Sequence, residues 1–278
     1  MNLIIIGNGF DLAHKLPTSY CDFKKYLSSF EDGMKELVVI ETLYDLGGPK
    51  WKNFESGLVK IKKTLDAERV INMFGYMDVC VVTKKIQDRF VNWIRCICKS
   101  YNYPPVNEYK LDTNDLYFTF NYTHTLHDAY GIDSDNINHI HGCAIGVNFM
   151  GINEIKFGHE KGIKSDDANQ QKLLDETIKD VDNILCQNRK YFENLKSQPI
   201  EAIKVFGCSC SDIDFPYFEK IKECLPDARW EIGWHDDDGK LAAETYMKRL
   251  GIDQSRGKVL PNDDLFDKKP SLKAGDNN

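Results

Sequence analysis

LIIIGNGFD, residues 3–11, is the stretch that decides the fold class of this chain. Four aliphatic residues without polar alternation predict a strand that is buried on both faces, as in a parallel sheet. Gly7 and Gly9 follow at once, and glycine lets the backbone turn tightly and approach another group closely. Nucleotide-binding α/β folds begin with such a strand, turn and helix, and the turn faces an anion. The stretch therefore predicts an α/β, Rossmann-like, mostly parallel sheet flanked by helices.

The glycine turn departs from the dinucleotide fingerprint G-x-G-x-x-G at its last position. Leu12 stands where that fingerprint has its third glycine. This departure argues against a hydride-transfer dehydrogenase and favours a pocket that cleaves or senses a nucleotide. An ordinary strand-to-helix turn without a ligand is the alternative that remains open.

Composition narrows the class of protein further. The chain has 278 residues, 42% hydrophobic residues and 28% charged residues, as in a typical globular protein. Its net charge of −7 argues against general nucleic-acid binding. We expect no membrane association and a cytoplasmic location, because no apolar run is long enough to span a bilayer and no signal peptide is visible. The nine cysteines are expected to be mainly structural, reduced thiols.

The order of elements predicts one α/β domain over residues 1–260, with a helical block inserted at about 20–100. Ser19 or Thr18 is expected to cap the first inserted helix, and Trp51–Lys99 carries apolar stripes at helical spacing. Residues 164–198 are expected to be helical, and a strand over 230–234 is expected to be the last. The segment 261–278 is polar and is expected to be a mobile tail. Further strands are expected over residues 116–120, 137–142 and 202–206.

Polar or glycine-rich residues follow four of the expected strands. They are GNGFD after the first strand, Asn121 and Thr123 after the second, His141 after the third, and GCSCSD, residues 207–212, after the fourth. Because the carboxyl ends of parallel strands meet at one edge of a sheet, these groups are expected to converge on one pocket.

The residue types in this set suit a nucleotide. Backbone amides of Gly7, Asn8 and Gly9, the Gly207 turn and the Ser209 hydroxyl are expected to hold phosphate, whereas Asp11 and Asp212 are expected to accept hydrogen bonds from ribose. The amide of Asn121 can orient a sugar hydroxyl or a water, and His141 can act as a general base. No G-x-S-x-G turn is found, which favours attack by water over an acyl-enzyme. The full predicted set is Asn121 and His141 as catalytic residues, with Gly7, Asn8, Gly9, Asp11, Thr123, Gly207, Ser209 and Asp212 as ligand-binding residues.

Several of these motifs together resemble the AbiH family of bacteriophage abortive infection proteins. The resemblance covers roughly residues 1–235 and rests on IGNGFDLAH (6–14), LPTSYxDF (16–23), WxxFE (51–55), FNYT (120–123), IHG (140–142), FGH (157–159) and FGCSxxDxD (206–214). The chain departs from the family at Lys15, where glycine is common, and at Cys208, where histidine is expected. Membership would imply a role in phage defence and a phage-encoded trigger.

The same order of motifs is more distantly similar to sirtuin-like NAD-binding proteins. In that resemblance Asn121 and His141 match the sirtuin-like Asn and His, which implies cleavage of NAD+ at its nicotinamide–ribose bond. Tyr122-Thr123 differs from the sirtuin pattern, and the cysteine spacing of the sirtuin zinc module is absent from this sequence. NAD+ is thus expected as the substrate, and no metal cofactor is expected.

Structural roles compete with these functional ones. Asn121 could cap the helix that follows it. The role of His141 could be limited to donating a hydrogen bond to a backbone carbonyl. His124 and His127 have a helical spacing that suits a metal, but a metal site is the less favoured interpretation. The roles of Glu55 and His159 stay open.

Three classes of function remain. The first is an NAD+ glycohydrolase that depletes NAD+ after infection. The second is a non-catalytic module that senses a nucleotide or a phage protein. The third and weakest is a metal-dependent nuclease. The oligomeric state stays open, with a homo-oligomer among the options.

Overall fold

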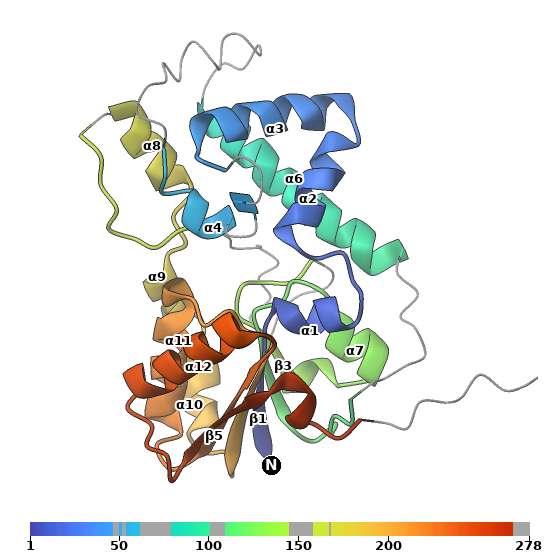
Figure 1. Cartoon of the computed structure of the whole chain (residues 1–278), viewed down its shortest axis with the longest axis vertical. Helices are drawn as coiled ribbons and strands as arrows, with labels where there is room; N and C mark the ends of the chain where they lie inside the picture. The colour runs from blue at the N-terminus through green and yellow to red at the C-terminus, as the bar shows by residue number, and fades with distance from the viewer. Residues whose placement is uncertain are drawn as a thin grey trace, which may run out of the picture. The chain divides into compact units, whose positions relative to one another are not determined.

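The computed structural model describes residues 1–46, 50–51, 54–61, 79–100, 109–144, 158–166 and 168–268. The chain divides into two compact units, shown in Figure 1. The first unit comprises Met1–Leu16, Tyr101–Asn153 and Leu185–Asn278, and the second comprises Pro17–Ser100 and Glu154–Ile184. The helical block expected at about 20–100 thus lies in the second unit, together with a later segment of the chain.

A six-stranded parallel sheet forms the centre of the first unit. The order is β3-β2-β1-β4-β5-β6, so the first strand lies in the middle and the chain proceeds outward on both sides. This is the doubly wound order of Rossmann folds, and it confirms the predicted fold class. The strands are β1 (Asn2–Ile6), β2 (Leu116–Thr119), β3 (Ile137–His139), β4 (Ala202–Phe206), β5 (Arg229–Trp234) and β6 (Gly257–Pro261).

The register of the strands aligns their carboxyl ends. Ile6 of β1 pairs with Thr119 of β2 and with Phe206 of β4. Thr119 pairs in turn with His139 of β3. The residues that follow these four strands therefore leave the sheet along one edge, as the sequence predicted.

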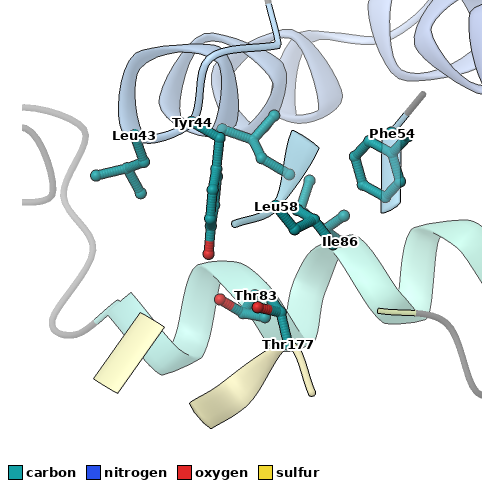
Figure 2. Close-up of a pocket in the computed structure, with 8 residues that line it drawn as sticks. Leu43, Tyr44, Phe54, Leu58, Thr83, Ile86 and Thr177 are labelled. Carbon is teal, nitrogen blue, oxygen red and sulfur yellow. The ribbon is translucent and has the colours of Figure 1, made fainter. Parts of the chain in front are cut away.

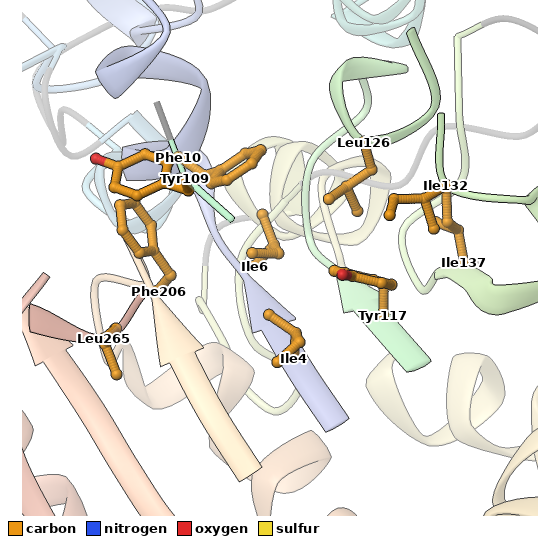
Figure 3. Close-up of a cluster of buried hydrophobic side chains, with 10 residues drawn as sticks. All are labelled: Ile4, Ile6, Phe10, Tyr109, Tyr117, Leu126, Ile132, Ile137, Phe206 and Leu265. Carbon is orange, nitrogen blue, oxygen red and sulfur yellow. The ribbon is translucent and has the colours of Figure 1, made fainter. Parts of the chain in front are cut away.

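Both faces of the central strands are buried, which explains their uninterrupted apolar sequence. Ile4 and Ile6 of β1 point toward one face, where Figure 3 shows them with Tyr117, Phe10 and Leu126. The alternate residues, such as Phe118, face the other side, where the Phe118 ring lies 6.2 Å from that of Phe192. The burial of apolar surface on two faces is the main stabilising contribution to this unit.

Helices connect the strands of the first unit. Their bounds are α1 (Asn8–Ala13), α7 (Thr125–Tyr130), α10 (Arg189–Leu195), α11 (Phe215–Cys224) and α12 (Asp237–Arg249), and α9 (Val181–Gln187) spans the limit between the units. Three 3-10 helices, η2 (Ser134–Asn136), η3 (Asp212–Asp214) and η4 (Asn262–Asp264), lie between them.

The second unit is helical in the part that the structure describes. It contains α2 (Tyr20–Ser28), α3 (Glu31–Leu43), α4 (Phe54–Gly57), α6 (Val79–Ser100) and α8 (Ala168–Glu176). In Figure 1, α2, α3 and α6 lie side by side, and their elements contact one another. Ser19 caps α2, as predicted, because its side chain accepts a hydrogen bond from the Asp22 amide. An aromatic core fills the unit, with the fully or nearly fully buried rings of Phe23, Trp51, Phe54, Phe90 and Trp93.

Two sequence expectations differ from the observed elements. The helix expected over 164–198 is three helices, because Thr177–Lys179 pairs with His159 through backbone hydrogen bonds instead of continuing α8. The strand expected to be the last, β5, is followed by β6 and η4. Leu265, just after η4, is buried in the core of the first unit. Residues 62–78 of the expected helical stretch Trp51–Lys99, and residue 157 of the FGH motif, lie outside the described residues.

Within the described residues, no helix combines the length and the apolar character that crossing a bilayer requires.

Candidate functional site

The edge of the sheet at the carboxyl ends of β1 to β4 collects most of the residues that the sequence singles out. Gly7 follows β1, Asn121 follows β2, His141 follows β3 and Gly207 follows β4. In an open α/β sheet, ligands bind at this edge, where the strand order reverses. The reversal in this protein lies between β1 and β4.

The two glycine turns at the reversal pack backbone against backbone. A side-chain Cβ at Gly9 would lie 2.6 Å from the Cα of Gly207, and a Cβ at Gly7 would lie 2.6 Å from the Gly207 carbonyl oxygen. The Gly9 amide donates to the Gly207 carbonyl at 2.9 Å, and the Gly7 amide donates to Phe206 at 2.9 Å. Two amides of the turn bond to carbonyls of the protein, and its glycines allow the close packing. The phosphate contacts expected of this turn stay a prediction.

Asp11 forms a buried connection between the turn after β1 and the segment after β2. Its side chain is 1% exposed. The Thr123 hydroxyl donates to Oδ2 and the Thr125 hydroxyl donates to Oδ1, each at 2.7 Å. Burial raises the pKa of Asp11 from 3.8 to about 6, against the hydrogen bonds of Thr123, Thr125 and Asn121, which lower it. Asp11 and Thr123 bond to each other, and the ligand contacts expected of both stay a prediction.

His141 lies in an aromatic environment beside a carboxylate. Its Nε2 is 3.8 Å from Oδ1 of Asp214, and its ring is only 3% exposed. The ring centroid of His141 lies 5.2 Å from that of Phe120 and 5.3 Å from that of Tyr217. The Ser211 hydroxyl donates to the other carboxylate oxygen of Asp214 at 2.9 Å. A carboxylate beside a histidine is an arrangement that can orient the imidazole and stabilise its protonated form.

Asn121 is 7% exposed and takes part in several contacts. Its backbone amide donates to the Thr119 hydroxyl at 3.0 Å, and its side chain lies near enough to Asp11 to lower the pKa of that carboxyl. Its carbonyl oxygen lies 2.9 Å from Nδ1 of His139. Burial lowers the pKa of His139 to about 4, so this ring is neutral at pH 7 and Nδ1 donates to the carbonyl. An amide offers its NH2 group to an ionised carboxylate, so an Asn121 side chain directed at Asp11 would keep Oδ1 as an acceptor.

The other predicted ligand-binding residues lie at the surface. The side chains of Asn8, Ser209 and Asp212 are exposed. Asp212 forms an ion pair with Arg249. These positions place polar groups at the rim of the edge, whereas Asn121 and His141 are buried.

The cysteines near this edge have little thiolate character. Burial raises the pKa of Cys210 to about 12 and that of Cys208 well above its ordinary value. Both are therefore neutral thiols at pH 7, in agreement with the structural role predicted for them. Cys96 and Cys186, in contrast, are exposed. Burial therefore accounts for some of the cysteines in the described residues and not for these two.

Glu55 and His159 both belong to the second unit. The Glu55 carboxylate is 3.5 Å from the Lys179 ammonium, whose side chain is 1% exposed. His159 is also buried, and its two ring nitrogens face the carbonyl oxygens of Glu160 and Leu174 at 2.7 Å and 3.0 Å. These contacts give both residues a role in holding the second unit together.

An apolar pocket in the second unit has one polar end. Figure 2 shows the Tyr44 hydroxyl pointing toward the side chains of Thr83 and Thr177. Burial raises the pKa of Tyr44 above its ordinary value, so it remains a neutral phenol. The lining is otherwise aliphatic or aromatic, with Ile40, Leu43, Phe54, Leu58 and Ile86, and it offers no charged group to a ligand.

Sequence reasoning missed three residues of the first unit. Asp214 lies in the DxD of the last motif, yet it was assigned no role, although it is the carboxylate beside His141. Thr125 shares Asp11 with Thr123. Tyr217 packs against His141 from α11. The short spacing from Ser211 to Asp214 was the one local signal for Asp214; the others depend on contacts between distant segments.

Comparison with known proteins agrees with the motif pattern. The sequence matches the family described as bacteriophage abortive infection AbiH, over residues 3–80 and 63–234. No curated protein and no solved structure matches the chain. Lys15 adopts a positive φ of 61°, a conformation that glycine takes without strain. With a family match over most of its length, the chain belongs to the AbiH family of bacteriophage abortive infection proteins.

Proposed function

We propose that this AbiH protein acts in phage defence by hydrolysing NAD+ at the nicotinamide–ribose bond, with His141 as general base and Asn121 as the group that orients ribose and water. Membership in the abortive infection family supports the defence role. The chemical part is carried by one observation: buried His141 lies 3.8 Å from Asp214 at the carboxyl edge of the sheet. That edge is where α/β sheets bind nucleotides.

The proposed reaction assigns one task to each group. Water attacks C1′ of the ribose while the bond from C1′ to the nicotinamide nitrogen breaks. His141 takes the proton of the water, and Asp214 stabilises the imidazolium that results. Asn121 Oδ1 accepts a hydrogen bond from a ribose hydroxyl or from the water. The products are nicotinamide and ADP-ribose.

The distance between His141 and Asp214 is that of a loose ion pair. A separation of 3.8 Å exceeds a hydrogen bond but lies within ion-pair range. Catalytic hydrogen bonds are often long before substrate binds and shorten in the complex. Phosphate contacts would come from the exposed rim, from Asn8 and Ser209, because the Gly7 and Gly9 amides bond to carbonyls of the protein.

The test measures nicotinamide release from NAD+ by the purified full-length chain, with and without lysate of phage-infected cells. Release by the natural protein that falls roughly 100-fold in Asp214→Asn would support the proposal. Asp227→Asn is the matched control, because Asp227 is an exposed aspartate in the turn before β5, at the opposite edge of the sheet. No release under either condition would contradict the proposal.

A sensing module is the second candidate, and the exposed polar rim of the edge favours it. Asn8 and Ser209 can bind phosphate from this rim, which requires no turnover. A nucleotide that remains bound through purification, without release of nicotinamide, would support this alternative over hydrolysis.

A further inference from the structure

We propose that His124, His127 and Asp128 form a binding site for a divalent transition metal of the zinc class. Their ligand atoms, one nitrogen from each histidine and one carboxylate oxygen, all lie within 4.8 Å of one another. The site lies beside α7 in the first unit and involves none of the residues proposed to act on NAD+.

The spacing of the three residues places them on one side of a helix. His124 immediately precedes α7, and His127 and Asp128 lie in its first turn. Residues three and four apart are neighbours on a helix surface. The Asp128 amide donates to the His124 carbonyl at 2.8 Å, so His124 continues the helical geometry. The rings of His124 and His127 have centroids 6.0 Å apart.

The chemistry of this set favours a transition metal. Imidazole nitrogens suit Zn, Cu, Ni and Fe, whereas Mg²⁺ and Ca²⁺ prefer oxygen ligands. His127 Nδ1 already lies 2.9 Å from Asp128 Oδ1, so little movement would bring both onto one ion. The side chains of His127 and Asp128 are 54% and 32% exposed, which leaves the ligands open to solvent and to an entering ion.

A third imidazole, that of His139, lies next to the cluster and supports the metal site independently of the spacing on α7. The ring of His139 has its centroid 6.0 Å from that of His124. His139 Nδ1 donates to the Asn121 carbonyl, which fixes the tautomer and leaves the lone pair on Nε2. Histidines that bind metals commonly donate their other ring nitrogen to a carbonyl in this way. His139 thus offers a further nitrogen near His124, outside the group whose ligand atoms lie within 4.8 Å of one another.

The experiment is a titration of the untagged full-length chain with ZnCl2, followed by calorimetry and by thermal unfolding. The chain is first dialysed against a chelator and then against buffer. We expect one Zn²⁺ ion per chain, and a rise in Tm of about 5 °C at a free Zn²⁺ concentration 100 times the Kd. MgCl2 is expected to give neither effect.

His127→Ala should lower the Zn²⁺ affinity by about 10-fold or more. The side chain of His127 is exposed, so the variant is expected to fold, which its circular dichroism spectrum checks. His235→Ala is the matched control, because His235 is likewise exposed and followed by an aspartate. Absence of Zn²⁺ binding, or an equal effect of His127→Ala and His235→Ala, would overturn the proposal. Because binding is measured without NAD+, failure of the hydrolysis proposal would not affect this result.

Discussion

The turn after β1 and the segments after β3 and β4 differ in how distinctive their sequences are and in the contacts that their residues make. The turn after β1 carries the most distinctive sequence of the chain, yet its glycine amides bond to carbonyls and Asp11 bonds to two threonines. His141 and Asp214 come from shorter motifs, yet they place an imidazole beside a carboxylate. A distinctive pattern can thus mark a demanding backbone arrangement, while the residues proposed for catalysis lie elsewhere on the same edge.

The largest effect is expected where the two glycine turns meet. Gly207 has φ 67°, and a Cβ there would lie 2.5 Å from the Phe10 amide nitrogen. Gly207→Ala should therefore cost more than about 3 kcal/mol of unfolding free energy, from strain plus overpacking. Gly131→Ala is the control, since Gly131 has φ 65° with nothing within 4 Å of its Cβ position. That substitution should cost about 1–2 kcal/mol.

Urea denaturation of the two variants makes this measurement. Equal losses of unfolding free energy in Gly207→Ala and Gly131→Ala would show that close packing of the two turns does not stabilise the protein. The turn after β1 would then have no structural role to set against His141 and Asp214.

A buried carboxylate should make stability depend on pH. The folded pKa of Asp11 is about 6, above its ordinary 3.8, so the folded state binds the proton more tightly than the unfolded state. Its contribution to stability is therefore greatest below about pH 4 and is lost as pH rises through about 6. The two limits differ by about 3 kcal/mol.

Asp11→Asn should remove this part of the pH dependence, because the amide does not titrate. Urea denaturation from pH 4 to pH 8 for both proteins gives the difference between their profiles. Parallel profiles would mean that the pKa of Asp11 is the same in the folded and unfolded states, which would contradict the effect of its burial.

Thr125→Val should cost about 1.5–3 kcal/mol, because it removes a hydroxyl that donates to a buried carboxylate while keeping the shape of the side chain. Thr113→Val serves as the control, since Thr113 is exposed. Its effect should stay within about 0.5 kcal/mol. Thermal unfolding compares the two variants. Similar Tm changes in both would show that the hydrogen bond from Thr125 to Asp11 does not stabilise the protein.

The smallest effect is expected at Lys15. Its φ of 61° lies in the left-handed region, which strains a residue that has a side chain. Lys15→Gly should therefore stabilise the protein by about 0.5–1 kcal/mol. This is the relief of backbone strain minus the greater conformational entropy that glycine loses on folding. A loss of stability in chemical denaturation would contradict the expected relief of backbone strain.

The fold was largely predictable, because it depends on local apolar strands and on the turns after them. LIII, residues 3–6, predicts a strand buried on both faces, and β1 is the central strand that results. β6 was missed because Gly257 and Pro261 bound a short edge strand whose sequence lacks a clear pattern. The break after α8 was missed because it depends on pairing with distant His159.

The candidate site was predictable in position more than in role. The convergence of strand ends follows from parallel strands, and the register confirms it. The role of Asp11 could not be predicted, because its partners Thr123 and Thr125 are more than 100 residues away in the chain. Nothing local in the sequence distinguishes an aspartate that bonds to a ligand from one that bonds to the protein.

The most direct test compares Asp11→Asn with Asp214→Asn in one assay of nicotinamide release at pH 7.5, after circular dichroism shows that both are folded. If the residues after β1 are structural and those after β3 and β4 are chemical, Asp11→Asn should keep its rate within about 3-fold and Asp214→Asn should lose roughly 100-fold. A folded Asp11→Asn protein without activity, beside an Asp214→Asn protein at the natural rate, would contradict this division of roles.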